Sequence, residues 1–279
     1  MDVDASRGYL DRDYVQTIEE YFFCVIGSVH PQDRVIAYLK YVPDPAGKWG
    51  RKNRRFSRAL RYYTAMDVQE TLEFLERHPE YLYDSSVLGI KISAVPKSRV
   101  SVHLKPEEKL AQLLETKKLD VLQQKSVDLA KLISDESGVL LEHFGVTGSI
   151  LLDIHQAFSD IDLVVYGTNN GRMVKEALIR MYEMERSPIR RFDEKKAKEW
   201  CIDKAKRYPI TLQEASHIFH RKWGRGLFGE TMFSMHPIKL EEEITEQYGD
   251  RVFKPEGVAK IEATVSDASE ADFLPAVYK

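Results

Sequence analysis

The most informative pattern in the sequence is VTGSILLDIHQAFSDIDLVVYG, residues 146–167. It places Gly148 and Ser149 ahead of Asp160 and Asp162, with a single isoleucine between the two aspartates. Residues i and i+2 of a strand face the same side, so both carboxylates are expected to project together while Ile161 packs on the opposite face. Two ionised carboxylates side by side repel each other, and a divalent cation relieves that repulsion. The spacing therefore predicts a magnesium site on Asp160 and Asp162.

The pair Gly148–Ser149 stands where a strand or loop gives way to a short helix, expected over about 149–156. Glycine lets the backbone approach a ligand closely, and the free N–H groups at a helix start favour phosphate. The serine hydroxyl adds another donor. Gly148 and Ser149 are therefore the predicted nucleotide-binding residues, beside the predicted metal clamp.

This arrangement of apolar-Gly-Ser, a spacer and Asp-apolar-Asp resembles the signature of the DNA polymerase β-type nucleotidyltransferase superfamily. The whole chain also resembles archaeal proteins described as predicted nucleotidyltransferases. The resemblance implies an α+β fold whose core is a mixed sheet flanked by helices. It further implies transfer of a nucleotide from a nucleoside triphosphate to a hydroxyl acceptor, assisted by two Mg²⁺ ions that Asp160 and Asp162 would hold.

Superfamily members that catalyse usually carry a further Asp or Glu on a neighbouring strand. The predicted strand over 231–240 offers no carboxylate. Glu262, in a predicted strand over 260–265, is the best candidate for a third catalytic carboxylate, and we expect it within roughly 6 Å of Asp160 or Asp162. The weaker candidates are Glu230, Asp267 and Asp193.

A basic stretch over 48–61 combines seven cations with no acid: Lys48, Arg51, Lys52, Arg54, Arg55, Arg58 and Arg61. Aromatic residues are interleaved with these cations, namely Trp49 and Phe56, with Tyr62 and Tyr63 just beyond. Cations suit phosphate contacts, and aromatic rings suit base stacking. The stretch therefore predicts RNA binding through Arg51, Arg54, Arg55 and Arg58. A flexible, charged loop is the alternative.

The pattern of predicted strands and helices divides the chain into three parts. Residues 1–104 are expected to form a β-rich N-terminal domain, and 105–206 the nucleotidyltransferase core. Residues 207–279 are expected to form a C-terminal β-rich region that completes the core. Strands mixed with helices and lacking a regular βαβ period favour the α+β class.

The composition narrows the function classes. The net charge of -3 hides the basic stretch, no apolar run could span a bilayer, and the polar N-terminus does not resemble a secretory signal. With two distant cysteines, a cytoplasmic location is expected. The expected enzyme is a magnesium-dependent nucleotidyltransferase acting on RNA. The alternative is a non-catalytic RNA- or nucleotide-binding protein on a degenerate nucleotidyltransferase fold.

Overall fold

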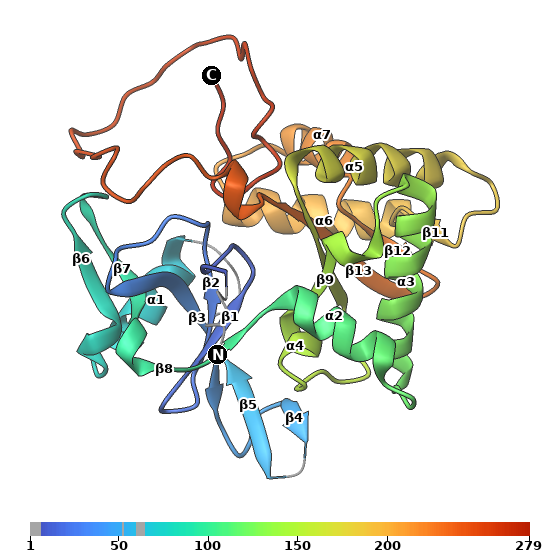
Figure 1. The fold of residues 1–279 in the computed structure, drawn as a ribbon. Helices are drawn as coiled ribbons and strands as arrows, with labels where there is room; N and C mark the ends of the chain where they lie inside the picture. The colour runs from blue at the N-terminus through green and yellow to red at the C-terminus, as the bar shows by residue number, and fades with distance from the viewer. Residues whose placement is uncertain (1–6, 52, 60–64) are drawn as a thin grey trace.

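The computed structural model describes residues 7–51, 53–59 and 65–279, and in them the chain forms two sheets with helices (Figure 1). The mixed α+β class is confirmed. Among the described residues, no helix is both long enough and apolar enough to cross a membrane.

The first sheet is eight-stranded and draws all of its strands from the chain up to Leu104. Its central path runs β4-β5-β3-β2-β1-β8, with β7 joined to β3 and β6 joined to β7. The strands are β1 (Tyr14–Thr17), β2 (Phe22–Val25), β3 (Arg34–Pro43), β4 (Trp49–Arg51), β5 (Arg54–Arg58), β6 (Leu82–Ser85), β7 (Ile90–Pro96) and β8 (Val100–Leu104). Helix α1 (Ala65–Leu75) contributes Leu75 to one face, against Phe23 and Leu39.

The second sheet is five-stranded, with the order β11-β12-β13-β10-β9. Its strands are β9 (Phe144–Thr147), β10 (Ile161–Tyr166), β11 (Ile189–Arg190), β12 (Arg225–Phe228) and β13 (Thr231–Ile238). Strands β10 and β13 are parallel, and the other pairs are antiparallel. The helices associated with this sheet are α2 (Pro106–Glu115), α3 (Val121–Ser137), α4 (Gly148–Leu151), α5 (Thr168–Glu183), α6 (Glu194–Arg207) and α7 (Leu212–Arg221).

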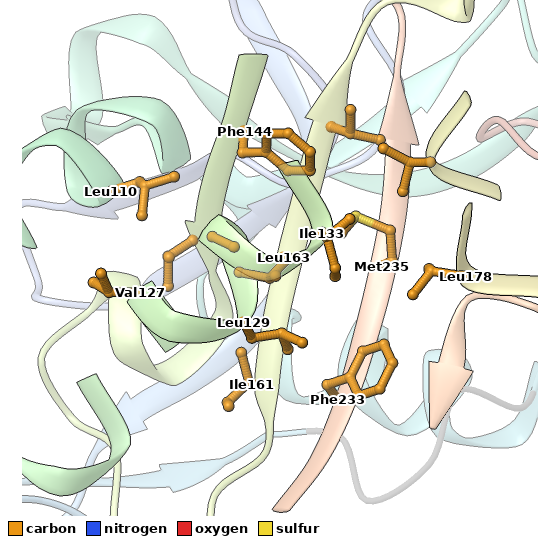
Figure 2. Close-up of a cluster of buried hydrophobic side chains, with 14 of the residues drawn as sticks. Leu110, Val127, Leu129, Ile133, Phe144, Ile161, Leu163, Leu178, Phe233 and Met235 are labelled. Atoms are coloured by element: carbon orange, nitrogen blue, oxygen red, sulfur yellow. The ribbon is translucent and has the colours of Figure 1, made fainter. Parts of the chain in front are cut away.

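One face of the second sheet is covered by α3 and α5, and Figure 2 shows this packing. Ile161 and Leu163 of β10 point into the cluster, as the alternation of the strand requires. Helix α3 is fixed at both ends, since Asp120 and Gln123 form a capping box and Gly138 ends the helix in the left-handed conformation. Because Ile161 and Leu163 face these helices, Asp162 between them lies on the opposite face of β10.

The two sheets meet through an apolar cluster. The second face of the first sheet contributes Tyr14, Phe22, Cys24, Tyr41 and Phe56. The segment that follows β9 contributes Leu151, Leu152 and Ile154. Because this segment joins Gly148 to Asp160, the N-terminal sheet fixes the chain between the two predicted motifs.

Several predicted elements differ from the structure. The strand expected over 260–265 does not form, and Ile261 within it is 83% exposed. Helix α4 has four residues and ends at Leu151, short of the expected 149–156. Strands β12 and β13 do join the second sheet, but the chain after Ile238 has no further strand beyond one bridge, Glu270–Val277. The description of 207–279 as β-rich is therefore wrong for its second half.

Candidate functional site

The two aspartates lie at the start of β10, with Asp160 just before the strand and Asp162 inside it. Ile161 is fully buried in the helix-covered core, so the carboxylates belong to the opposite face. Asp162 pairs with Thr147 on β9 and with Ser234 on β13. The acidic pair thus lies at the start of β10, between β9 and β13, on the side that faces the N-terminal sheet.

The aspartates perturb each other. Repulsion by Asp162, together with burial, raises the pKa of Asp160, against the pull of Arg58 and Lys40. Burial also acts to raise the pKa of Asp162, but Lys40, His236, the Ser234 hydroxyl and Arg12 outweigh it and hold that pKa below its usual value. One carboxylate is therefore stabilised as an anion and the other is not.

These two groups fit a divalent cation. Carboxylate oxygens are the donors that Mg²⁺ prefers, and the ion usually adds water and substrate phosphate to one or two protein carboxylates. A bound dication would offset the repulsion that raises the pKa of Asp160. Asp160 and Asp162 are the residues that would hold it.

Gly148 is in contact with the pair. Its φ is +68°, and a Cβ built on it would lie 2.4 Å from Oδ2 of Asp162. Any larger residue would be strained and would also collide with the carboxylate. Ser149 follows and is buried. The structure therefore brings the Gly-Ser motif and the Asp-x-Asp motif into one site.

A row of polar residues crosses the sheet at this level. The strand register places Thr147, Asp162, Ser234 and Arg225 side by side on β9, β10, β13 and β12. The Ser234 hydroxyl donates to Oδ1 of Asp162, and Nε2 of His236 lies 2.9 Å from the Ser234 Oγ. Burial and the positive charge of Arg12 lower the pKa of His236 to about 3, so this imidazole is neutral at physiological pH.

The expected third carboxylate is not beside the pair. Glu262 lies on an exposed segment without strand structure, so the strand alternation that suggested it does not exist. In the described part of the chain, no three His, Cys, Asp or Glu side chains gather into a group that could hold a metal. The β13 position opposite Asp162 is Ser234. The strand prediction that suggested Glu262 as a catalytic residue is therefore wrong.

The weaker candidates have other partners. Asp193 caps helix α6 by accepting from the Lys196 N–H, and Glu230 pairs with Arg190 at the β12–β13 turn. Asp267 pairs with Lys279 at 3.0 Å. None of these three replaces the missing acid.

The described part of the basic stretch is a β-hairpin, so the flexible-loop alternative does not hold for it. Strands β4 and β5 pair antiparallel, and the Gly50 N–H donates to the Ile154 carbonyl at 2.7 Å. Gln156 returns a 2.7 Å bond to the Gly50 carbonyl, and the Trp49 ring lies 6.0 Å from that of Phe158. The hairpin thus docks on the segment leading to Asp160. Lys52, Arg61, Tyr62 and Tyr63 lie outside the described residues.

The four arginines proposed for RNA have separate environments. Arg51 pairs with Asp120 at 2.7 Å and Arg54 with Glu20 at 3.1 Å. Arg55 donates to the Gly47 carbonyl at 2.7 Å. Arg58 lies over the Trp49 ring, 4.8 Å from its centroid, and its positive charge acts to lower the pKa of Asp160. The hairpin therefore adds positive charge to the rim of the acidic site.

Two cations near the site have no signal in the sequence. Lys40 stands where the β2–β3 register shifts, opposite the Phe22–Phe23 step. Such a bulge re-aims a side chain, and Lys40 acts on Asp160 and Asp162 alike. Arg12 lies in the turn before β1 and acts on Asp162 and His236. Neither residue could be predicted, because both positions depend on how the two sheets dock.

A cavity of about 530 Å³ lies elsewhere, between the first sheet, the end of β13 and the C-terminal segment. Its lining includes Asp11, Ile238 and Phe273 but neither Asp160 nor Asp162. The acidic pair is the candidate functional site because its two carboxylates perturb each other. It is not chosen for the volume of a cavity.

No family model matches this sequence, and no solved structure matches it. An uncharacterized protein of the archaeon Methanocaldococcus jannaschii is 33% identical over 274 residues, an alignment that covers 96% of this chain and 79% of the relative. The chain belongs to the same protein family as this archaeal relative.

Proposed function

We propose that the site between the two sheets binds a nucleoside triphosphate with magnesium and transfers its nucleotidyl group to a hydroxyl of an acceptor, with RNA as the acceptor and pyrophosphate as the leaving group. The observation that carries this proposal is the contact of Gly148 with Asp162. It joins the two halves of the motif that resembles the polymerase β-type nucleotidyltransferases. If the Gly-Ser turn and the Asp-x-Asp segment were two unrelated structural features, nothing would require them to be in contact.

The charges around the site support a polyanionic substrate. Lys40, Arg12 and Arg58 act on the aspartates from the N-terminal sheet, and Arg225 follows in the polar row on β12. A nucleotide bound with its metal needs both signs of charge, with carboxylates for the metal and cations for the phosphates. The site offers both.

Asp160 and Asp162 would hold magnesium, while the amide groups of Gly148 and Ser149 would face the phosphates. When bound, magnesium neutralises charge on the attacking and leaving oxygens. The Ser234 hydroxyl, by donating to Asp162, fixes the direction of that carboxylate. His236 holds Ser234 from the other side and carries no charge that would compete with the metal.

Ser234 is also the observation that favours a second candidate. It stands on the strand next to the pair, where a catalytic superfamily member would usually present a third acid. On this alternative the site binds a nucleotide or RNA without transferring anything. The metal and nucleotide contacts are shared, and only the chemistry is absent.

One experiment separates the two candidates. The purified protein is incubated with Mg²⁺, total RNA and each of the four nucleoside triphosphates labelled at the α-phosphate. Nucleotidyl transfer predicts label in RNA and its loss in Asp162→Asn. The binder predicts saturable nucleotide binding that depends on Asp162, with no label transferred. Absence of both would overturn the proposed function.

A further inference from the structure

We propose that Arg12 is a phosphate-binding residue of this site, reaching the phosphate chain of the bound nucleotide from the N-terminal side, across from Asp160 and Asp162. The identity of the nucleotide rests on the proposed function, whereas the anion subsite itself rests on the geometry of Arg12.

Arg12 occupies a position that ordinarily belongs to glycine. Residues Leu10–Asp13 form a tight turn, closed by a 3.1 Å bond from the Asp13 N–H to the Leu10 carbonyl. Arg12 is third in this turn and has a φ of +68°. Turns with a positive φ at that position favour glycine, because a Cβ is strained there. The chain nevertheless has an arginine, with a long cationic side chain, at this position.

The turn is anchored so that it cannot relax. The Gly27 N–H donates to Oδ1 of Asp11, and the Leu10 N–H donates to Oδ2 of Asp13, both at 3.0 Å. The Thr147 hydroxyl donates to the Arg12 carbonyl at 2.7 Å. Thr147 directly precedes Gly148, so the strained turn is tied to the start of the Gly-Ser motif. Strain held in this way is typical of functional sites.

The Arg12 guanidinium has few polar partners among the described residues. Its side chain is 26% exposed, and its buried Nε makes no hydrogen bond. The nearest carboxylate oxygen, Oδ2 of Asp11, lies 3.4 Å from Nε. Among the residues that the structure describes, no other ion pair or hydrogen bond involves this side chain. A buried donor without a partner costs free energy, and an incoming anion would remove that cost.

The same guanidinium is close to the candidate site. After burial, Arg12 is the strongest cause of the lowered pKa of His236, and it also helps to lower the pKa of Asp162. His236 and Asp162 both touch Ser234. Arg12 therefore stands beside the polar row, where an anion held by a metal on the aspartates would meet it.

Phosphate suits this donor. Arginine presents a planar fork of N–H groups that binds phosphate oxygens in pairs, and it keeps its charge at every physiological pH. The Nε atom is buried, and burial strengthens a contact made there. Arg12 would thus supply from the first sheet a contact that the five-stranded sheet cannot make alone.

The test uses inorganic tripolyphosphate with Mg²⁺ as the probe and calorimetry as the readout. Arg12→Gly removes the fork and relieves the backbone strain. We expect its dissociation constant to rise about tenfold or more, as for removal of a charge-assisted hydrogen bond, while its melting temperature stays level or rises. Arg12→Gln keeps the strain, removes the charge and should bind as weakly. The matched control is Glu20→Gly, since Glu20 also has a positive φ, of +63°, in another turn.

Glu20→Gly should match Arg12→Gly in melting temperature and the wild type in binding. Wild-type binding by both Arg12 variants, or no tripolyphosphate binding by the wild type, would overturn the assignment. So would unfolding of Arg12→Gly combined with wild-type affinity of Arg12→Gln. Nucleotide transfer is measured separately. Arg12-dependent tripolyphosphate binding without label transfer refutes only the enzyme, whereas label transfer that does not depend on Arg12 refutes only this inference.

Discussion

Gly148 and Asp162 are in contact, and the glycine has no room for a side chain: a Cβ at 148 would lie 2.4 Å from the Asp162 Oδ2. The contact joins β9 to β10 at the point where those strands pair through Thr147 and Asp162. It makes the Gly-Ser motif and the Asp-x-Asp motif a single structural unit. The consequences can be measured on stability and on metal binding.

Gly148→Ala is expected to destabilise the protein by two separate effects. The left-handed backbone costs about 1–2 kcal/mol for a residue with a Cβ, and the collision adds about 1–3 kcal/mol. Gly229→Ala is the matched control, since Gly229 has a φ of +57° and nothing within 4 Å of the added Cβ. Chemical denaturation of both variants gives the difference. Equal losses of stability in the two variants would show that Gly148 makes no tight contact.

The two aspartates should differ in their effect on the metal-free protein. The pKa of Asp160 is raised by Asp162, so its ionised form costs stability at neutral pH, and Asp160→Asn should be neutral or stabilising. The pKa of Asp162 is lowered, so its ionised form contributes stability that is lost as the pH falls, and Asp162→Asn should be destabilising. Thermal melts in chelator at pH 7 test this. The reverse order of the two melting temperatures would refute the charge assignment.

Asp120 should stabilise the hairpin contact in a pH-dependent way. It caps α3 and accepts from Arg51 and His155, and with burial opposing, these bonds lower its pKa to about 2. Its contribution is present above about pH 4, the usual range of the group, and fades as the pH falls towards 2. Because the side chain is 36% exposed, we expect only about 1 kcal/mol or less for Asp120→Asn at pH 7.

Asparagine still caps a helix, so Asp120→Asn isolates the effect of the charge. Asp128→Asn on the same helix is the control, since Asp128 is exposed and accepts from Gln124 of its own helix. The difference between the two variants should shrink when melts are repeated from pH 6 down to pH 3. A gap that stays constant with pH would contradict the proposed charge contact.

RNA binding, if it uses the β4–β5 hairpin, should depend on salt through Arg51, Arg54, Arg55 and Arg58. Each phosphate-binding arginine that is replaced by alanine should flatten the salt slope by about 0.7–0.9 of a unit. A control variant removes the same number of exposed cations elsewhere: Arg172, Arg180, Arg186 and Lys198. Filter binding across a salt series compares them. Equal slopes in the two variants would show that the hairpin is not the RNA surface.

The parts of the site that are local in the chain could be predicted. Period-two alternation predicts that Asp160 and Asp162 face the same side while Ile161 packs into the core. In the structure Ile161 is buried, and Asp162 acts on the pKa of Asp160. Lys40 and Arg12 could not be predicted, because a register shift and a strained turn place them, and both depend on docking of the two sheets. Their positions are properties of the tertiary structure.

The errors also have physical causes. Glu262 lies in a segment that alternates like a strand, but alternation forms a strand only where a partner strand is available. The position of Ser234 beside Asp162 could not be predicted from the sequence, because it depends on the register between β10 and β13.

Mn²⁺ electron paramagnetic resonance measures metal binding by the acidic pair. The protein is titrated with Mn²⁺ in the presence of a nucleoside triphosphate analogue that carries a methylene group between the α- and β-phosphorus atoms. We expect nucleotide-dependent Mn²⁺ binding that Asp160→Asn and Asp162→Asn each weaken about tenfold or more, and that Glu262→Gln leaves unchanged. Equal Mn²⁺ affinity in the wild type and both aspartate variants would contradict it.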